Sequence, residues 1–85
     1  MKNIVVYSKP DCPWCDKAKT LLKNYKFAYN EKVLNVDYSK EDLRVLIGPE
    51  KKLTVPQIFI DDKLIGGYEN LVKYFEDHFI FGMQE

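Results

Sequence analysis

The sequence of 85 residues has few cysteines, no net charge and no long apolar run, and each of these shortages excludes a class of protein. Two cysteines and one histidine cannot complete a structural zinc site, which needs four ligands, and cannot form a disulfide-rich scaffold. Thirteen basic and thirteen acidic side chains cancel, whereas a nucleic-acid-binding domain normally carries a basic surface. No apolar run approaches the roughly 18 residues that a membrane-spanning helix needs. We therefore expect no bound metal, no nucleic-acid partner and no contact with a membrane.

The N-terminus lacks the apolar stretch of a secretory signal. Four apolar residues, Ile4 to Tyr7, follow Lys2, whereas the hydrophobic region of a signal peptide has about 7–15 residues. We therefore expect the protein to work in the cytoplasm, where thiols are kept reduced. A persistent structural disulfide is rare in that compartment, whereas a transient disulfide that forms during a reaction is compatible with it.

Apolar and aromatic residues are plentiful enough to form one folded domain. Hydrophobic residues make up 46% of the chain and aromatic residues 14%, which argues against disorder. The length allows a single domain over residues 1–85, and no repeat, linker or low-complexity segment divides it. A domain of this size buries about 60% of its unfolded surface, so its margin of stability is small.

Four short apolar segments predict a sheet. They lie at residues 4–7, 33–36, 58–60 and 63–65. A helix between the first two predicts a parallel pair with a right-handed crossover, and the turn at Asp61-Asp62 predicts an antiparallel hairpin. The predicted fold class is therefore α/β, with a small four-stranded mixed sheet flanked by three helices in the order β-α-β-α-β-β-α.

Apolar residues at a spacing of about 3.6 predict these three helices. The first begins at Pro13, which suits the first helical position, and ends near Tyr25. The second begins after Ser39, whose side chain can cap it together with Asp42, and ends at Gly48-Pro49. The expected apolar faces comprise Cys15, Ala18, Leu21 or Leu22, and Tyr25 in the first helix, Leu43, Leu46 and Ile47 in the second, and Tyr68, Leu71, Val72, Phe75 and Phe79 in the third.

The two cysteines have the spacing of a redox-active dithiol, in Cys12-Pro13-Trp14-Cys15. Cys12 directly precedes a helix, where unpaired N–H groups and the helix dipole favour a thiolate, and Lys9 adds positive potential. Because the thiolate is the nucleophile, we predict that Cys12 attacks the substrate. Cys15 lies one turn later and is placed to resolve the mixed disulfide that results. Trp14 is expected either beside the thiol with a partly exposed ring or packed in the core.

Two further segments carry chemistry. A proline suits the first residue of a strand, and Thr54-Val55-Pro56 directly precedes the third predicted strand. If Pro56 packs opposite the first cysteine, the free backbone of Val55 can pair with an extended peptide. Gly66-Gly67 permits a tight entry into the last helix, whose N-terminus favours anions. Glu69 in the first turn of that helix either complements the dipole or grips the ammonium group of a ligand.

With these segments in this order, the chain resembles a glutaredoxin from Asn3 to about Phe79. The resemblance implies a thioredoxin-like fold and glutathione-dependent thiol–disulfide exchange. A thioredoxin would be expected to carry Gly-Pro where this chain has Pro13-Trp14. The segments that carry the resemblance are Tyr7-Ser8-Lys9-Pro10-Asp11-Cys12-Pro13-Trp14-Cys15, Thr54-Val55-Pro56-Gln57-Ile58-Phe59-Ile60 and Ile65-Gly66-Gly67-Tyr68-Glu69-Asn70-Leu71.

The resemblance also implies how glutathione would bind, as a co-substrate rather than a tightly held cofactor. Lys9 would contact its glycine carboxylate, Val55 beside a cis Pro56 would pair with its cysteinyl backbone, and Tyr68 and Glu69 would hold its γ-glutamyl end. Thr54 and Trp14 would line the same groove. Three positions depart from the family pattern: Trp14 stands where tyrosine is usual, Tyr68 replaces a smaller residue and Glu69 replaces aspartate.

The implied partners are glutathione and proteins that carry a disulfide or a glutathionylated cysteine, and a monomer is expected. The Gly-Gly-Tyr segment at residues 66–68 and the small size are similar to phage glutaredoxins, which implies ribonucleotide reductase as one such protein. Two alternatives remain. In one, Cys12 and glutathione from two protomers ligate an iron–sulfur cluster for delivery, although the rigid Pro13 counts against it. In the other, the dithiol serves one protein partner without glutathione.

Overall fold

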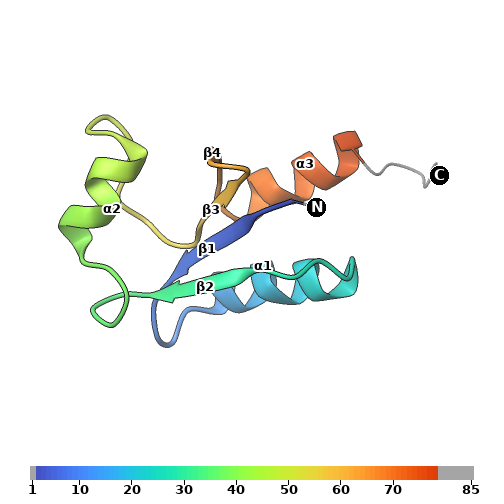
Figure 1. Ribbon diagram of the computed structural model, residues 1–85, viewed down its shortest axis with the longest axis horizontal. Helices are drawn as coiled ribbons and strands as arrows, with labels where there is room; N and C mark the ends of the chain where they lie inside the picture. Colours follow the sequence, from blue (N-terminus) through green and yellow to red (C-terminus); the bar gives the residue numbers. More distant parts are fainter. Residues whose placement is uncertain (1, 79–85) are drawn as a thin grey trace.

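The computed structural model describes residues 2–78, which form seven elements in the predicted order (Figure 1). Of the six elements for which the sequence predicts bounds, five lie within about a residue of their observed bounds, and the second strand is the exception. The strands are β1 (Ile4–Ser8), β2 (Asn30–Val33), β3 (Gln57–Ile60) and β4 (Lys63–Gly66), and the helices are α1 (Pro13–Asn24), α2 (Lys40–Ile47) and α3 (Tyr68–His78).

The four strands form one mixed sheet in the order β2-β1-β3-β4. Strands β1 and β2, which α1 connects along the chain, run parallel to each other. Strand β3 is antiparallel to both β1 and β4. Asp61 and Asp62 make the turn between β3 and β4 with φ angles of 52° and 68°. Two consecutive positive φ angles are typical of the tight turns that match the twist of a hairpin. The predicted sheet and its hairpin are therefore confirmed.

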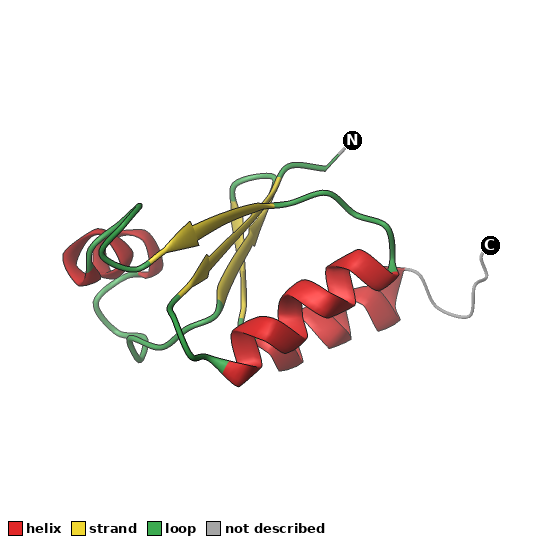
Figure 2. Cartoon of the chain, turned by 90° about the horizontal axis from the view of Figure 1, so that it is seen from below, coloured by secondary structure: helices red, strands yellow, loops and turns green. Residues whose placement is uncertain are grey.

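Helices cover both faces of this sheet. Figure 2 shows α1 and α3 side by side below one face, and α2 packs against the other. Because successive side chains of a strand point to opposite faces, Val6 enters the core below the sheet and Tyr7 contacts the core beside α2. The core below the sheet contains Ile4, Val6, Ala18, Leu22, Ile58, Ile60, Leu71 and Phe75, and the smaller core contains Tyr38, Leu43 and Ile47.

The second strand lies three residues earlier than the apolar segment 33–36 predicts. The strand that pairs with β1 is Asn30–Val33, and the chain turns after its last residue. Asn35 has a positive φ of 65°, and the N–H groups of Val36 and Asp37 donate to the carbonyl of the last strand residue at 3.0 and 2.8 Å. The Asp37 carboxylate accepts the N–H of that same residue at 2.8 Å. Turn formation by Asn and Asp thus outweighs the strand preference of Val36, whose side chain is 78% exposed.

Helix α2 begins as predicted, but its buried face is narrower. Ser39 Oγ accepts the N–H of Asp42 at 3.1 Å, and the Asp42 carboxylate accepts the N–H of Ser39 at 2.9 Å, so the capping box is confirmed. Leu43 and Ile47 are buried, but the prediction that Leu46 shares their face is wrong, since it is 45% exposed. Successive residues of a helix are about 100° apart around its axis. Leu43 and Ile47 are four positions apart and lie on one face, whereas Leu46 lies at the edge of that face.

The other two helices bury one face each. In α3, Leu71 and Phe75 are buried and Val72 is half-buried, whereas Phe79 lies outside the described residues. In α1, Leu22 is the fully buried member of the leucine pair, and the leucine before it is half-buried. The prediction that Tyr25 belongs to this buried face is wrong, since it is the cap residue after the helix and is 46% exposed. The buried faces of α1 and α3 pack into the same core, and the first turns of the two helices lie near the same end of the sheet (Figure 2).

Candidate active site

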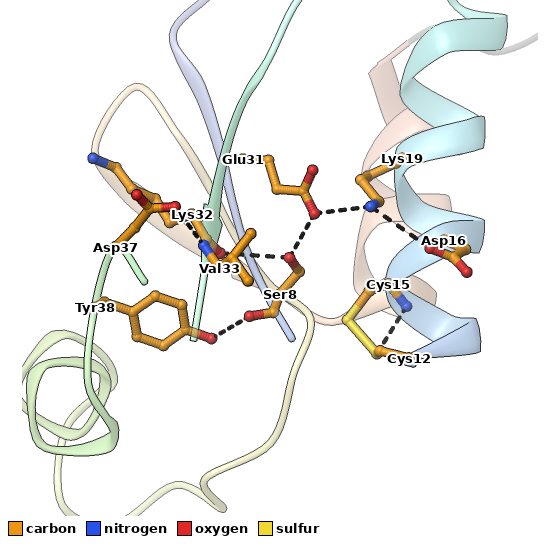
Figure 3. Close-up of polar contacts among 10 residues, drawn as sticks. All are labelled: Ser8, Cys12, Cys15, Asp16, Lys19, Glu31, Lys32, Val33, Asp37 and Tyr38. Atoms are coloured by element: carbon orange, nitrogen blue, oxygen red, sulfur yellow. Dashed lines mark hydrogen bonds and ion pairs between the residues drawn. A yellow bond between two sulfur atoms is a disulfide. The ribbon is translucent and has the colours of Figure 1, made fainter. Parts of the chain in front are cut away.

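Cys12 is the cap residue of α1, where the chain is still extended, with φ −122° and ψ 97°. Its sulfur accepts a hydrogen bond from the N–H of Cys15 at 3.2 Å (Figure 3). Its carbonyl accepts one from the N–H of Asp16 at 3.0 Å. Pro13 occupies the first helical position, where its missing N–H removes no helix hydrogen bond. The sulfur therefore lies where the unpaired amides of the first turn can stabilise a negative charge.

Cys12 and Cys15 are joined by a disulfide, with their Cα atoms 5.2 Å apart. Cys12 retains 7% exposure, whereas Cys15 retains 1%. Cys12 is therefore the more accessible residue of the pair. This difference in burial is what the predicted division of labour between nucleophile and resolving thiol requires.

The loop before β3 is fixed by a side chain for which the sequence predicts no role. The Val55–Pro56 peptide bond is cis, as the family resemblance implies, and Pro56 is buried. The buried amide of Gln57 donates to the Thr54 carbonyl at 2.9 Å and to the Thr54 hydroxyl at 3.3 Å. These two bonds span the cis peptide and hold the half-buried Val55 in place. The signal in the sequence that identifies this role is the amide side chain of Gln57 at the first residue of a strand, where an apolar residue would be expected.

Asn70 and two glycines set the entry to α3. The side-chain oxygen of Asn70 accepts the N–H of Gly67 at 3.0 Å. Gly66 has a φ of 120°, and a Cβ at this position would lie 2.6 Å from the same oxygen, so both the backbone and the space require glycine. A Cβ on Gly67 would lie 3.5 Å from the Pro56 carbonyl oxygen. The first turn of α3 is therefore held directly against the cis-proline loop.

A groove of about 210 Å³ lies between the start of α1, the cis-proline loop and the start of α3. The Trp14 ring is 50% exposed, so the alternative that it packs in the core is wrong, and its centre lies 5.7 Å from that of Tyr68. The Lys17 ammonium lies 4.6 Å from the centre of the Trp14 ring, within the range of a cation–π contact. The groove is lined by Trp14, Thr54, Val55, Pro56, Gly67, Tyr68, Glu69 and Asn70, and so brings together six of the predicted binding residues.

Lys9 does not line this groove but a neighbouring hollow of about 310 Å³. Thr54 and Val55 belong to the walls of both spaces, so the two meet along the backbone before the cis-proline. The predicted contact of Lys9 with a glycine carboxylate therefore requires a ligand that crosses Val55. That contact stays a prediction, as does the placement of Pro56 opposite Cys12.

A polar network that no sequence pattern indicates joins β1, β2 and α1 beside the cysteines (Figure 3). Ser8 is 1% exposed and donates its hydroxyl to a Glu31 oxygen at 2.7 Å. Lys19 donates to the same oxygen at 2.8 Å and lies 3.6 Å from the Asp16 carboxylate. The hydrogen bond from Lys19, aided by that from Ser8, lowers the pKa of Glu31, and the bond to Glu31 raises the pKa of Lys19.

The carbonyl of Ser8 completes this network on the other side of the sheet. It accepts the hydroxyl of Tyr38 at 2.7 Å and the N–H of Leu34 at 2.9 Å. Burial raises the pKa of Tyr38, which keeps its hydroxyl protonated as a donor. The partners of Ser8 lie more than 20 positions away along the chain, so no spacing within the sequence indicates them.

We expect the stabilising effect of the Glu31 carboxylate to disappear in acid. The pKa of Glu31 is lowered in the folded state. The carboxylate therefore stabilises the fold fully above pH 4.5, and this stabilisation is lost as the pH falls through the lower pKa of the folded state. Glu31→Gln should lower the free energy of unfolding at neutral pH by about 1 kcal/mol or less, because the pair is partly exposed. Urea unfolding of both proteins in a pH series should show the difference shrinking below 4.5. Glu76→Gln, at an exposed position of α3, is the control, and a pH-independent difference would contradict the assignment.

A disulfide at a helix N-terminus suits thiol–disulfide exchange. The groove, which is lined by the second residue of that helix, brings together two aromatic rings, the backbone of Val55 and the carboxylate of Glu69, and these groups suit an extended peptide. Within residues 2–78, no group of three or more His, Cys, Asp and Glu side chains is placed to hold a metal ion. The helices of that segment are each too short or too polar to cross a membrane.

Comparison with known proteins identifies similar sequences and structures. A family model described as glutaredoxin matches residues 4–65. Glutaredoxin 3 of Escherichia coli strain K12 is 38% identical over 71 residues, which cover 84% of this chain and 83% of that protein. The hybrid peroxiredoxin hyPrx5 of Haemophilus influenzae is 40% identical over 74 residues, or 87% of this chain, but the chain spans 30% of that protein. The crystal structure of a buckwheat glutaredoxin–glutathione complex matches with a TM-score of 0.76 at 26% identity, covering 96% of this chain and 76% of that one.

Proposed function

The chain belongs to the glutaredoxin family, with its thioredoxin-like fold and thiol–disulfide oxidoreductase chemistry, and we propose that glutathione is the thiol that supplies its electrons. The observation that carries this proposal is the groove of Trp14, Val55 and Tyr68 beside the helix that starts at the Cys12–Cys15 disulfide. The similar buckwheat protein was crystallised with glutathione, which supports the same class of ligand here.

The charges around Val55 suit the two ends of glutathione. Glutathione carries an ammonium and a carboxylate on its γ-glutamyl end and a carboxylate on its glycine end. Glu69 lines the groove on one side of Val55, where it can pair with the ammonium, and Lys9 lines the hollow on the other, where it can pair with the glycine carboxylate. An extended backbone between them can pair with Val55 as a short added strand.

With a glutathionylated protein, the proposed reaction uses one protein thiol. The Cys12 thiolate attacks the glutathione sulfur, the protein–glutathione disulfide breaks, and the protein leaves as a thiolate that takes up a proton. The thiolate of a second glutathione then attacks the bound glutathione sulfur, which releases oxidised glutathione and restores the Cys12 thiolate. The N–H of Cys15, which donates to the Cys12 sulfur, stabilises the anion at both stages.

With a protein disulfide, the proposed reaction uses both cysteines. Cys12 attacks one substrate sulfur, and the other substrate sulfur leaves as a thiolate. The Cys15 thiolate then attacks the Cys12 sulfur, which breaks the mixed disulfide and forms the Cys12–Cys15 bond that the structure contains. Two glutathione molecules return the pair of electrons, and no other cofactor is needed because the cysteine pair carries them.

The proposed partners follow from this chemistry. They are glutathione and proteins with a disulfide or a glutathionylated cysteine, and the resemblance to phage glutaredoxins supports ribonucleotide reductase as one of them. We propose that the protein acts as a monomer, because the exchange described above needs one dithiol and a single chain carries it.

The source of electrons can be tested directly. Reduction of insulin disulfides should proceed with NADPH, glutathione reductase and glutathione, and should stop when glutathione is left out. NADPH with thioredoxin reductase should sustain less than about a tenth of that rate, because the groove matches a tripeptide rather than a protein surface. Both rates are measured as NADPH oxidation at matched reductase activity. Turnover with thioredoxin reductase and none with glutathione would favour the glutathione-independent dithiol donor instead.

A further inference from the structure

The hollow next to the groove is larger than one lysine–carboxylate contact needs. It has a volume of about 310 Å³ and lies between the start of α2, the loop before the cis-proline and the loop after β1. The proposed reaction uses Lys9 and the shared wall at Thr54 and Val55, and leaves the rest of the hollow without a role. The lining residues are Lys9, Leu34, Tyr38, Lys40, Leu43, Leu53, Thr54 and Val55.

Two kinds of side chain line this hollow. Leu34 and Leu43 are among the side chains of the core beside α2, and Leu53 is 36% exposed at the surface. Two exposed lysines, Lys9 and Lys40, supply its charge, and the lining contains no carboxylate to neutralise them. The Tyr38 hydroxyl is already donated to a backbone carbonyl. The hollow therefore offers an apolar surface beside two ammonium groups, which suits an aliphatic side chain next to a carboxylate.

We propose that this hollow binds the residues that follow the reacting cysteine in a polypeptide disulfide, and that it favours an aliphatic residue followed by an acidic one. The direction in which the polypeptide runs rests on the proposed function, in which the glycine end of glutathione points toward Lys9. A polypeptide that pairs with Val55 in the same direction continues past the glycine position into the hollow. Each further extended residue adds about 3.3 Å, so one or two residues reach toward Lys40.

The hollow thus distinguishes a polypeptide from glutathione. Glutathione ends at its glycine carboxylate, which Lys9 can satisfy alone, so Lys40 and Leu53 lie beyond the tripeptide. A polypeptide has no carboxylate at that point, and an acidic side chain one or two residues later takes over both lysines. Lys40 is therefore a specificity determinant that acts on protein substrates and leaves small disulfides unaffected.

Symmetric peptide disulfides provide the test. The reduced protein is mixed with the disulfide dimer of Gly-Cys-Leu-Glu or of the reversed Glu-Leu-Cys-Gly, both acetylated at the N-terminus and amidated at the C-terminus so that neither presents a glycine carboxylate. The released peptide thiol is measured in a single turnover. Each turnover oxidises the Cys12–Cys15 dithiol and reduces one peptide disulfide to two thiols, so no glutathione is present. A negative result for peptide binding in the hollow can therefore be distinguished from a negative result for the proposed glutathione dependence. We expect the first peptide to react about fivefold faster than the reversed one.

Charge reversal at Lys40 gives the decisive comparison. Lys40→Glu should remove the preference for Gly-Cys-Leu-Glu and favour Gly-Cys-Leu-Lys instead, each by about fivefold, with the rate for hydroxyethyl disulfide unchanged. Lys63→Glu, an equal change of net charge at an exposed residue that does not line the hollow, is the matched control. Equal rates for the forward and reversed peptides, or equal effects of the two variants on the acidic peptide, would overturn the proposal.

Discussion

Replacing Cys12 by serine should abolish turnover. A serine hydroxyl is not ionised at neutral pH and forms no disulfide, so the first exchange cannot occur, and we expect less than about a thousandth of the wild-type rate. Serine is itself a preferred helix cap, so the variant should keep the start of α1 and fold normally. The rate is measured with a mixed disulfide of glutathione and hydroxyethanethiol, coupled to glutathione reductase. Activity retained in this variant would remove Cys12 as the nucleophile.

The matched variant Cys15→Ser should separate the two proposed reactions. Removal of glutathione from a mixed disulfide needs Cys12 alone and should continue, because the backbone N–H that donates to the Cys12 sulfur is kept. Reduction of insulin disulfides needs a second thiolate to release the product, and its rate should fall by about tenfold or more at low glutathione concentration. Far-ultraviolet circular dichroism checks that the buried hydroxyl is tolerated. Loss of both activities in a folded variant would contradict the single-cysteine route.

Truncating one buried leucine should destabilise the whole domain. Leu22 of α1 is completely buried in the core between the sheet and the helices α1 and α3. Leu22→Ala removes buried methyl groups and leaves a cavity, which costs about 2–5 kcal/mol of the free energy of unfolding. A domain of this length has little stability to spare, so we expect a large shift of the urea midpoint or unfolding at room temperature.

Leu46 offers a control with the same chemistry. It lies on α2, and its side chain is 45% exposed, so Leu46→Ala should change the free energy of unfolding by about 0.5 kcal/mol or less. Both variants are measured by urea unfolding followed by circular dichroism. Similar midpoints for the two variants would show that the core assigned to α1 does not carry the stability of the fold.

The sequence predicts best the features that depend on near neighbours. The cap at Cys12, the capping box of Ser39 and Asp42 and the turn at Asp61-Asp62 each involve groups within about four residues of one another. Their geometry follows from backbone preferences and short-range hydrogen bonds, which are the same wherever the segment lies. The position of the dithiol at a helix start is predicted correctly for this reason. The order of elements and the mixed sheet are also predicted correctly, from hydrophobic periodicity and the rules of strand connection.

The candidate groove was predicted in part for a different reason. Trp14, Val55 and Tyr68 belong to three separate segments, and their assembly around one space was inferred from the order of those segments and from the family resemblance. Sequence periodicity does not indicate the roles of Gln57 and Asn70, which fix two of these segments. Each makes a hydrogen bond to a residue three positions away, but a polar side chain in a strand or helix forms such a bond only where the backbone bends to meet it.

The tertiary structure decided what depends on distant parts of the chain. The second strand is Asn30–Val33 rather than 33–36, because β1 and the turn after the strand set the register. Ser8 meets Glu31 across 23 positions of sequence, and Lys9 shares a hollow with Lys40. Sequence periodicity indicates which face of an element is apolar but not which partner lies opposite, since the partner is chosen by packing of the whole chain. The dithiol chemistry was therefore readable from the sequence, whereas the surroundings that select its substrates required the fold.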